Sequence, residues 1–186
     1  MENNEEIKNI LSKTPFNSYI DLFSSVYAGK TTLLLSNFAC RQITQIEKPI
    51  YANMGIFLGF IPSLILTVWY SIRVENLWLL FLILLELILP HLIYFFQNFN
   101  CKIHYIAYFV ILLSLFIDIP TTIFLLMLIL LFSYWGVTFW KRSLYKKSIK
   151  ILSVREDVFV WAYNSNNLSV SDCFGNLYYK FKEETK

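Results

Sequence analysis

Apolar residues fill the middle of the chain in long runs that short polar breaks separate. The first run, residues 51–72, ends at a break that contains Arg73 and Glu75, and the second run, residues 77–96, is followed by Gln97. A helix rises about 1.5 Å per residue, so about 20 residues cross the roughly 30 Å of bilayer hydrocarbon. Both runs have about this length, and they predict two transmembrane helices.

The apolar stretch 103–140 is too long for one span, because as a single helix it would measure roughly 57 Å. Asp118 and Pro120 break it: proline disfavours helix in the preceding residue, and aspartate can hydrogen-bond the exposed backbone of a turn. These residues predict a hairpin of two spans, 103–117 and 119–140. The alternative is one tilted span followed by a cytosolic extension.

The segment before the apolar runs, residues 1–50, has the pattern of amphipathic helices on the cytosolic side. Thr14-Pro15 is typical of a helix N-terminus, and apolar residues then recur at helical spacing over residues 16–27. A second helix is predicted over residues 33–46. Because neither helix has a lysine-rich polar face, the pattern favours packing on protein over packing on a lipid surface.

After a basic start, the spacing of apolar residues in the segment 141–186 differs from that of the preceding helices. Segments 149–154, 157–163 and 176–182 are rich in β-branched and aromatic residues and are separated by turn signals, which predicts a small β-rich meander. Fewer than about 40 residues cannot bury a core of their own, so this tail should pack on the N-terminal helices, on membrane-proximal surface or on another copy.

The fold class predicted from these patterns is an integral membrane, mainly α protein. It has four transmembrane helices within residues 51–140, N-terminal amphipathic helices and a small C-terminal β-rich cytosolic tail. Composition agrees, because mean hydropathy is +0.51 and charged residues make up 16%, against about 25% in typical soluble domains. Soluble classes are therefore excluded at this stage, and membrane lipids are the expected partners.

The net charge of +3 comes largely from a basic cluster that follows the last run. The cluster consists of Lys141, Arg142, Lys146, Lys147 and Lys150. We interpret it as a positive-inside anchor, with attraction to anionic lipid as a secondary effect. It predicts a multi-pass protein of the bacterial inner membrane with both termini in the cytoplasm.

Motifs for catalysis, cofactor binding and metal binding are missing from the sequence. The string Gly29-Lys30-Thr31 resembles the end of a phosphate-binding loop, but the required glycine five residues earlier is Ser24, so a helix-helix turn is predicted. His91 and His104 lack acidic or cysteine partners at metal-ligand spacing. We predict no enzyme activity, no cofactor and no direct nucleic-acid binding. The cysteines are interpreted as reduced packing thiols: Cys40, Cys101 and Cys173.

Glu86 is the most informative polar residue, because it lies in the middle of the second run, where a carboxylate costs several kcal/mol unless it has a partner or a wet cavity. Pro90 removes the amide that would bond the Glu86 carbonyl, which predicts a kink beside the acid. Glu86 is either a pore-lining or gating carboxylate or a protonated acid hydrogen-bonded to Tyr, Ser or Asn on an adjacent helix. Pro62 is a second candidate kink. His91 is a further pore candidate that is more simply interpreted as an interfacial residue.

The first run also carries a ladder of small residues. Gly55, Gly59 and Ser63 recur at every fourth position and therefore share one helix face. Such a face lets another helix approach closely, either within one chain or between copies.

In its plan the chain resembles the small multi-span proteins that bacteria use as membrane effectors or accessories in anti-phage defence, and less closely the colicin immunity type. The shared features are the short helical N-terminus, four spans and a small tail, so the resemblance implies no functional residue. The first hypothesis is a homo-oligomeric pore or channel gated by a cytosolic protein or a nucleotide. The alternatives are a non-conducting membrane binding module and a small proton-coupled transporter.

Overall fold

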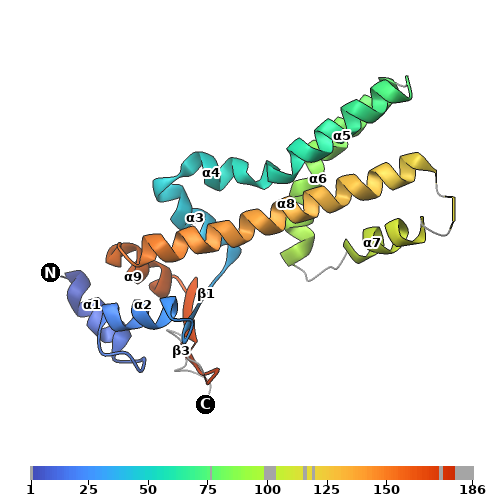
Figure 1. Cartoon of the computed structure of the whole chain (residues 1–186). Coiled ribbons are helices and arrows are strands. Elements are labelled where there is room, and N and C mark those ends of the chain that lie inside the picture. The colour runs from blue at the N-terminus through green and yellow to red at the C-terminus, as the bar shows by residue number, and fades with distance from the viewer. Residues whose placement is uncertain are drawn as a thin grey trace, which may run out of the picture. The chain divides into compact units, whose positions relative to one another are not determined.

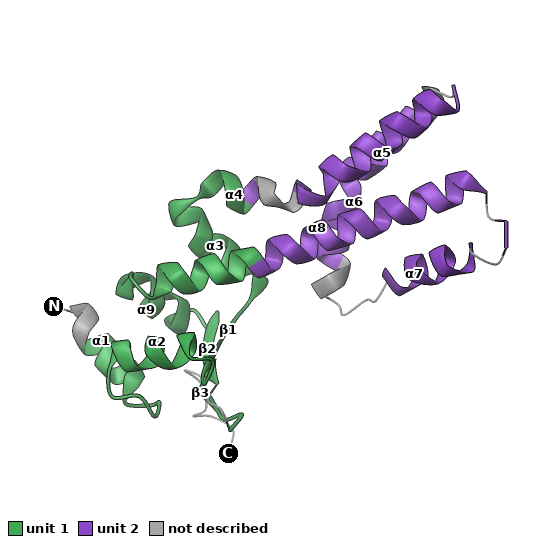
Figure 2. Cartoon of the chain, in the orientation of Figure 1, with its two compact units in different colours: residues 1–52, 143–186 green, residues 53–142 purple. Residues whose placement is uncertain are grey.

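The computed structural model describes residues 2–75, 77–98, 104–114, 117–118, 120–171 and 174–178. The chain divides into two compact units, shown in green and purple in Figure 2. Residues 1–52 and 143–186 form the first, which we call the globular unit, and residues 53–142 form the second, which we call the apolar unit. Both ends of the chain therefore belong to one unit.

The globular unit combines helices from both ends of the chain with a small sheet (Figure 1). Its elements are α1 (Glu2–Leu11), α2 (Tyr19–Tyr27), β1 (Thr32–Leu35), α3 (Asn37–Glu47), α9 (Glu156–Asn164), β2 (Leu168–Ser171) and β3 (Leu177–Tyr178), with the beginning of α4 (Pro49–Met54) and the end of α8 (Thr121–Leu152). The strands are antiparallel in the order β1-β2-β3. Thr32 pairs with Ser171 and Leu35 with Leu168, so the N-terminal segment and the tail share one sheet.

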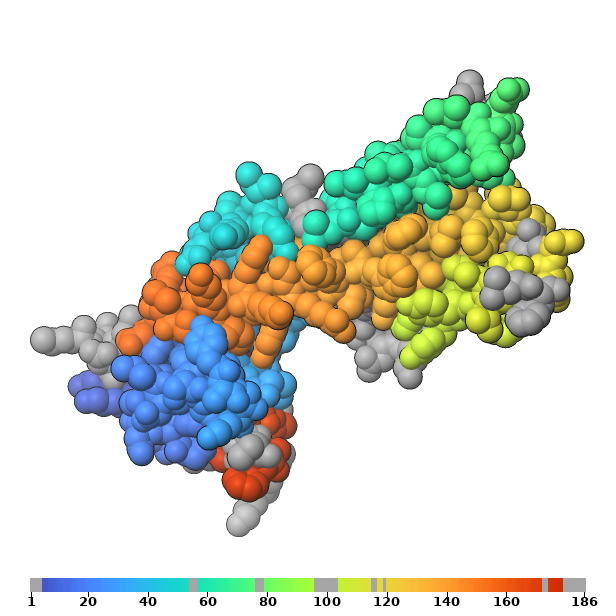
Figure 3. Space-filling model, viewed as in Figure 1, coloured from blue at the N-terminus to red at the C-terminus, as the bar shows by residue number. Residues whose placement is uncertain are grey.

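The core of the globular unit is built from apolar side chains of both chain ends. Leu22, Leu33 and Phe159 are completely buried, and the rings of Tyr19 and Phe159 meet edge to face at 5.2 Å. The Tyr19 hydroxyl also donates a hydrogen bond to the Leu152 carbonyl, one of the groups that the end of α8 leaves without an intrahelical partner. In Figure 3 blue N-terminal atoms lie against orange C-terminal atoms of this unit. The tail thus packs on the N-terminal helices, and burial of the shared core requires both ends.

Local capping decides where α2 begins. The Ser18 hydroxyl accepts a hydrogen bond from the Asp21 amide, which starts the helix at Tyr19. The Thr14 hydroxyl donates instead to the Leu11 carbonyl, next to the end of α1. The helix predicted from residue 14 therefore begins several residues later than the sequence indicated.

The helix predicted over residues 33–46 also begins later. Thr32–Leu35 is a strand, because it pairs with β2 along its whole length. The Ser36 hydroxyl then accepts a hydrogen bond from the Ala39 amide and caps α3. A pairing with residues so distant in the chain has no local signature in the sequence.

Two of the strands predicted in the tail are helical. Residues 149–154 contain the end of α8, and residues 157–163 lie within α9. The prediction failed because short apolar runs rich in β-branched residues do not distinguish a buried strand from a buried helix. Four buried residues of α9 are spaced as one face of a helix: Val158, Phe159, Ala162 and Tyr163. Of the segment 176–182, Leu177–Tyr178 forms β3, and the part from residue 179 lies outside the described residues.

The apolar unit consists of helices. They are η1 (Gly55–Gly59, a 3-10 helix), α5 (Phe60–Arg73), η2 (Leu77–Phe81, a 3-10 helix), α6 (Leu82–Asn98), α7 (His104–Leu113) and the first part of α8. α5 packs along α6, and both 3-10 helices contact this pair. α7 packs on α8 through aromatic rings: His104 stacks on Tyr134 at 4.0 Å, and the Trp135 indole donates to the Tyr108 hydroxyl at 2.8 Å.

The prediction of four transmembrane helices is wrong. Among the described residues, α8 is the one helix long and apolar enough to cross a membrane, and the other apolar helices have 10–17 residues. The run 51–72 is divided among α4, η1 and α5, and the run 77–96 begins with the 3-10 turns of η2. In the described residues of the span predicted over 103–117, the helix is α7. The length of an apolar run overestimates the length of unbroken helix where 3-10 turns interrupt it. α8 is in turn longer than the span predicted over 119–140, because it continues to Leu152.

Cys40, on α3, should not react with thiol reagents in the folded protein. Its side chain is 3% exposed, and burial raises the pKa of the thiol to about 11, so the reactive thiolate is scarce at pH 8. The measurement is the reaction with Ellman's reagent of a variant with Cys101→Ser and Cys173→Ser, two cysteines that lie outside the described residues. We expect no reaction over minutes without denaturant and one thiol with it. Equal rates in both conditions would contradict this placement of α3.

Candidate functional site

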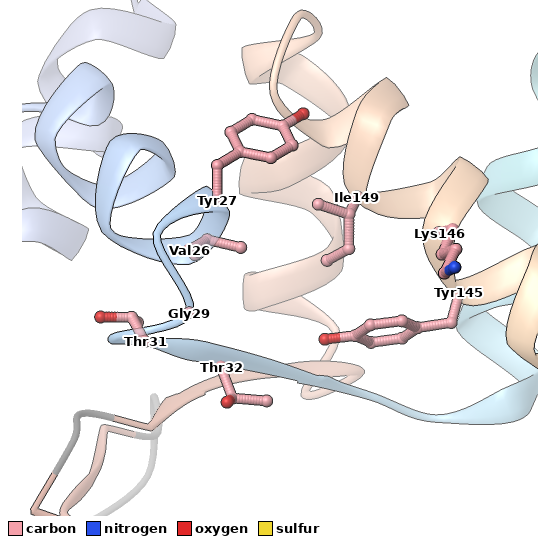
Figure 4. Close-up of a pocket in the computed structure, with 8 residues that line it drawn as sticks. All are labelled: Val26, Tyr27, Gly29, Thr31, Thr32, Tyr145, Lys146 and Ile149. Carbon is pink, nitrogen blue, oxygen red and sulfur yellow. The ribbon is translucent and has the colours of Figure 1, made fainter.

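A pocket of about 370 Å³ lies in the globular unit (Figure 4). The end of α2, the turn after it, the start of β1 and one face of α8 form its walls. The residues that line it are Val26, Tyr27, Gly29, Thr31, Thr32, Tyr145, Lys146 and Ile149. The fold thus brings together residues from the two ends of the chain, and we call this site the tyrosine pocket.

The turn between α2 and β1 forms one side of the tyrosine pocket. The Gly29 amide donates to the Val26 carbonyl at 3.0 Å, and Gly29 has a φ of +72°, which glycine adopts without steric cost. The hydroxyls of Ser25 and Thr31 hydrogen-bond to each other at 2.6 Å across the turn. The string predicted as a helix-helix turn therefore connects a helix to a strand.

Hydrogen bonds hold both tyrosine rings of the pocket in place. The Tyr145 hydroxyl donates to the Leu33 carbonyl at 2.8 Å, and the Tyr27 hydroxyl donates to Ser153 Oγ at 3.0 Å. Figure 4 shows the two rings bordering the pocket on different sides. Because their hydroxyls are already bonded within the protein, the rings present mainly their aromatic surfaces to the pocket.

Two polar side chains of the pocket remain available. Within the described part of the chain, neither the Lys146 ammonium nor the Thr32 hydroxyl has a hydrogen-bond or ion-pair partner. Both side chains are exposed. The pocket can therefore offer a cation and a hydroxyl to a bound molecule.

Glu86, on α6, forms a buried polar cluster with α5. The Thr67 hydroxyl donates to Glu86 Oε1, and Ser63 Oγ lies 3.2 Å from Glu86 Oε2. All three side chains are 0% exposed. We call these residues the buried carboxyl cluster. Within this cluster the hydrogen-bond partners of the Glu86 carboxyl group come from the same chain, in an otherwise apolar environment.

The polar and apolar faces of α5 are reversed relative to those of a helix that faces water. Its buried residues all carry hydroxyls: Ser63, Thr67 and Ser71. Its exposed residues include large apolar side chains with exposed fractions from 52% to 68%: Ile61, Ile65, Trp69 and Ile72. A helix at a protein–water boundary buries its apolar side and exposes its polar side. α5 does the opposite.

Small residues bring α8 close to the start of α5. A Cβ atom on Gly59 would collide with the Phe132 carbonyl, and one on Gly136 would collide with the backbone of Gly59. Gly55, the first member of the predicted ladder, lies in η1, and Ser63, the third, belongs to the buried carboxyl cluster. Among the three residues of the ladder, Gly59 is the one at which the structure shows another helix, α8, in close contact.

The other pore and gating candidates lie on α5 and α6. Pro62 lies in the first turn of α5, where a missing amide breaks no intrahelical hydrogen bond. Pro90 lies inside α6, which continues past it. His91 is exposed, and its ring lies 5.3 Å from the ring of Phe57. None of them contacts the buried carboxyl cluster through a hydrogen bond in the described residues.

The basic cluster divides between the two units. Lys141 and Arg142 belong to the apolar unit, where the Lys141 ammonium lies 4.5 Å from the centre of the Tyr94 ring. In the globular unit the Lys147 ammonium lies over the Tyr51 ring, Lys146 lines the tyrosine pocket and Lys150 is exposed. The five residues therefore have different surroundings, and their role as a lipid anchor stays a prediction.

The buried carboxyl cluster predicts how substitutions at Glu86 affect stability. Glu86→Gln should melt within a few degrees of the wild type in detergent, because the amide oxygen can still accept from Thr67. Glu86→Ala should lose about 2 kcal/mol, because truncation leaves the buried Thr67 hydroxyl without its acceptor and opens a cavity. The control is Leu87→Ala, at the exposed neighbouring position. Equal melting temperatures of the Glu86→Ala and Leu87→Ala proteins would contradict the placement of Glu86 in a buried cluster.

Comparison of the chain with models of known protein families, with curated proteins and with solved structures found no match.

Sequence reasoning missed the tyrosine pocket. The string 29–31 resembles the end of a phosphate-binding loop and Lys146 belongs to the basic cluster, but no pattern in the sequence indicates that the two line one pocket. The partners of Tyr145 and Tyr27 were equally invisible, because Leu33 and Ser153 lie far from them in the chain. The only related feature visible in the sequence is that the segments forming the pocket walls have apolar faces. Any amphipathic helix has such a face, so this feature does not indicate a pocket.

Proposed function

We propose that the protein is a membrane-anchored binding module, in which lipid surrounds the apolar unit and the globular unit carries out recognition. The inverted pattern of α5 supports this proposal most directly: hydroxyl side chains are buried, and isoleucine and tryptophan side chains are exposed. In water such a surface would be costly, since each exposed large apolar side chain forfeits about 1.5–3 kcal/mol. In lipid the same surface costs nothing, and buried hydroxyls favour contact between helices.

The rest of the apolar unit supports the same environment. Large apolar side chains are also exposed on α6, α7 and α8, with exposed fractions of 56% for Ile88, 64% for Phe109 and 64% for Phe139. Glu86, the acid of α6, is completely buried. Carboxyl groups inside membranes are expected to face other protein groups in this way.

The division of the chain constrains how it would lie in a membrane. α8 is long and apolar enough to cross a bilayer. Residues 1–52 and 143–186 fold into one unit, so both must be on the same side. The basic residues that follow residue 140 favour the cytoplasm of a bacterium as this side.

The burial of Glu86 favours a non-conducting module over a pore. A pore-lining acid would point into a water-filled lumen, whereas the Glu86 carboxyl group accepts hydrogen bonds from Ser63 and Thr67. Homo-oligomerisation, gating by a cytosolic partner and a role in anti-phage defence stay predictions. Proteoliposomes that contain the purified protein should show no ion flux above that of empty liposomes, and sustained flux would favour the pore.

Two matched substitutions test the membrane location. Ile65→Asp places a carboxylate on the exposed side of α5, and Ile20→Asp does the same on α2 of the globular unit, where Ile20 is 79% exposed. If lipid surrounds the apolar unit, Ile65→Asp should reduce the yield of carbonate-resistant membrane protein severalfold, because a charge in hydrocarbon is costly. Ile20→Asp should leave that yield unchanged. A wild-type chain that alkaline carbonate releases, or an Ile65→Asp protein that remains as stable as wild type, would overturn the proposal.

A further inference from the structure

We propose that the tyrosine pocket binds a small anionic aromatic molecule, a planar ring that carries a phosphate, of which a nucleoside monophosphate is the simplest probe. This inference deepens the proposed function, because it names the ligand class that the globular unit would recognise. It rests on the size of the pocket, the nature of its walls and the charge at its rim.

The size of the pocket limits the ligand to a small molecule. Its volume of about 370 Å³ is at the lower end of the range of about 300–1,000 Å³ that is typical of ligand sites. A folded partner or a nucleic-acid strand would need an extended surface instead. The pocket is also built from two segments of one unit that are far apart in the chain, residues 26–32 and 145–149, so it exists only when the unit is folded.

The walls of the pocket favour a planar ring. Tyr27 and Tyr145 are both held by hydrogen bonds from their hydroxyls, so little side-chain entropy would be lost when a ligand packs against them. Val26 and Ile149 supply apolar surface between them. Aromatic rings prefer offset-stacked or edge-to-face contacts with tyrosine, and a planar ring in the pocket could make them with either tyrosine.

The rim of the pocket favours an anion. The Lys146 ammonium is without a partner in the described residues and can donate to a phosphate oxygen. Among the described residues that line the pocket there is no aspartate or glutamate that would repel a phosphate. Lys30, which follows Gly29, is exposed and adds positive charge nearby.

Equilibrium binding of AMP and GMP to the detergent-purified full chain tests the proposal. We expect saturable binding of at least one monophosphate. The matching nucleoside and inorganic phosphate should each bind at least about tenfold more weakly, because each lacks one of the two recognised parts. Vesicles of phosphatidylglycerol, which offer a phosphate without a ring, should not compete. Competition by these vesicles, binding of inorganic phosphate as tight as that of AMP or GMP, or no saturable binding of either nucleotide would overturn the proposal.

Variants locate the binding. Lys146→Gln should weaken nucleotide binding by about ten- to hundredfold, because it removes a charge-assisted hydrogen bond. Lys150→Gln removes the same charge from the same helix outside the pocket and should bind like wild type. Both variants should melt like wild type, since both lysines are exposed. Equal binding by the Lys146→Gln and wild-type proteins would overturn the assignment. The direct binding measurements with AMP and GMP need no bilayer, so their failure is distinguishable from a failure of the membrane proposal.

Discussion

Replacing Phe159 by alanine should lower the free energy of unfolding of the globular unit by about 3–5 kcal/mol. Phe159 is completely buried on α9, and its ring lies 5.2 Å from that of Tyr19 and 6.1 Å from that of Phe23, both on α2. The substitution leaves a cavity where the two chain ends meet. A loss of this size is a large part of the total stability of a small unit, so the N-terminal helices should unfold with the C-terminal ones.

Limited proteolysis in increasing urea measures this effect on each end of the chain. Cleavage within residues 1–48 and cleavage after residue 153 should shift to lower urea together in the Phe159→Ala protein. Phe174→Ala is the matched control, because the Phe174 side chain is 86% exposed. A Phe159→Ala protein in which residues 1–48 resist cleavage like the control would contradict the shared core.

Replacing Gly136 by valine should destabilise the apolar unit by about 3 kcal/mol. In an ordinary helix, replacing glycine removes a flexible residue and is favourable or neutral. Here the sign reverses, because the new Cβ would collide with the backbone of Gly59, and a backbone cannot move aside as a flexible side chain can. α5 and α8 would have to separate, which removes their packing contacts.

Thermal melting in detergent measures the effect of Gly136→Val. Thr122→Val, which introduces the same side chain at an exposed position of α8, is the control and should change the melting temperature little. Gly59→Ala should resemble Gly136→Val in direction, because its Cβ meets the Phe132 carbonyl. If Gly136→Val melted with or above the control, the close approach of the two helices would be wrong.

The sequence predicted the local features of the fold better than its long-range ones. It located helical segments near residues 16–27 and 33–46, but their starts depend on Ser18 and Ser36 acting as caps. β1 depends on a partner strand more than a hundred residues away, which no local pattern reveals. The four predicted spans failed for a different reason: apolar composition does not show where 3-10 turns such as η1 and η2 divide a run.

The candidate sites were also only partly predictable. Glu86 stands out in the sequence because an acid in an apolar run needs a hydrogen-bond partner, and serine is one of the partners that the sequence analysis predicts. The structure places Ser63 and also Thr67 beside it, and the participation of threonine was not foreseen. The spacing of Ser63, Thr67 and Ser71 by four residues was available in the sequence as a signal, because it places three hydroxyls on one face of α5. The tyrosine pocket had no such local signal.

Collision accessibility of a nitroxide spin label on α5 tests the central claim, that lipid covers the exposed side of this helix. The label is attached at Ile65→Cys in liposomes and, for comparison, at Ile20→Cys in the globular unit, with Cys101 and Cys173 replaced by serine. We expect the label at position 65 to collide often with oxygen, which is concentrated in lipid, and rarely with a water-soluble nickel chelate, whereas the label at position 20 should show the reverse. A label at position 65 that is as accessible to the nickel chelate as the label at position 20 would contradict the account.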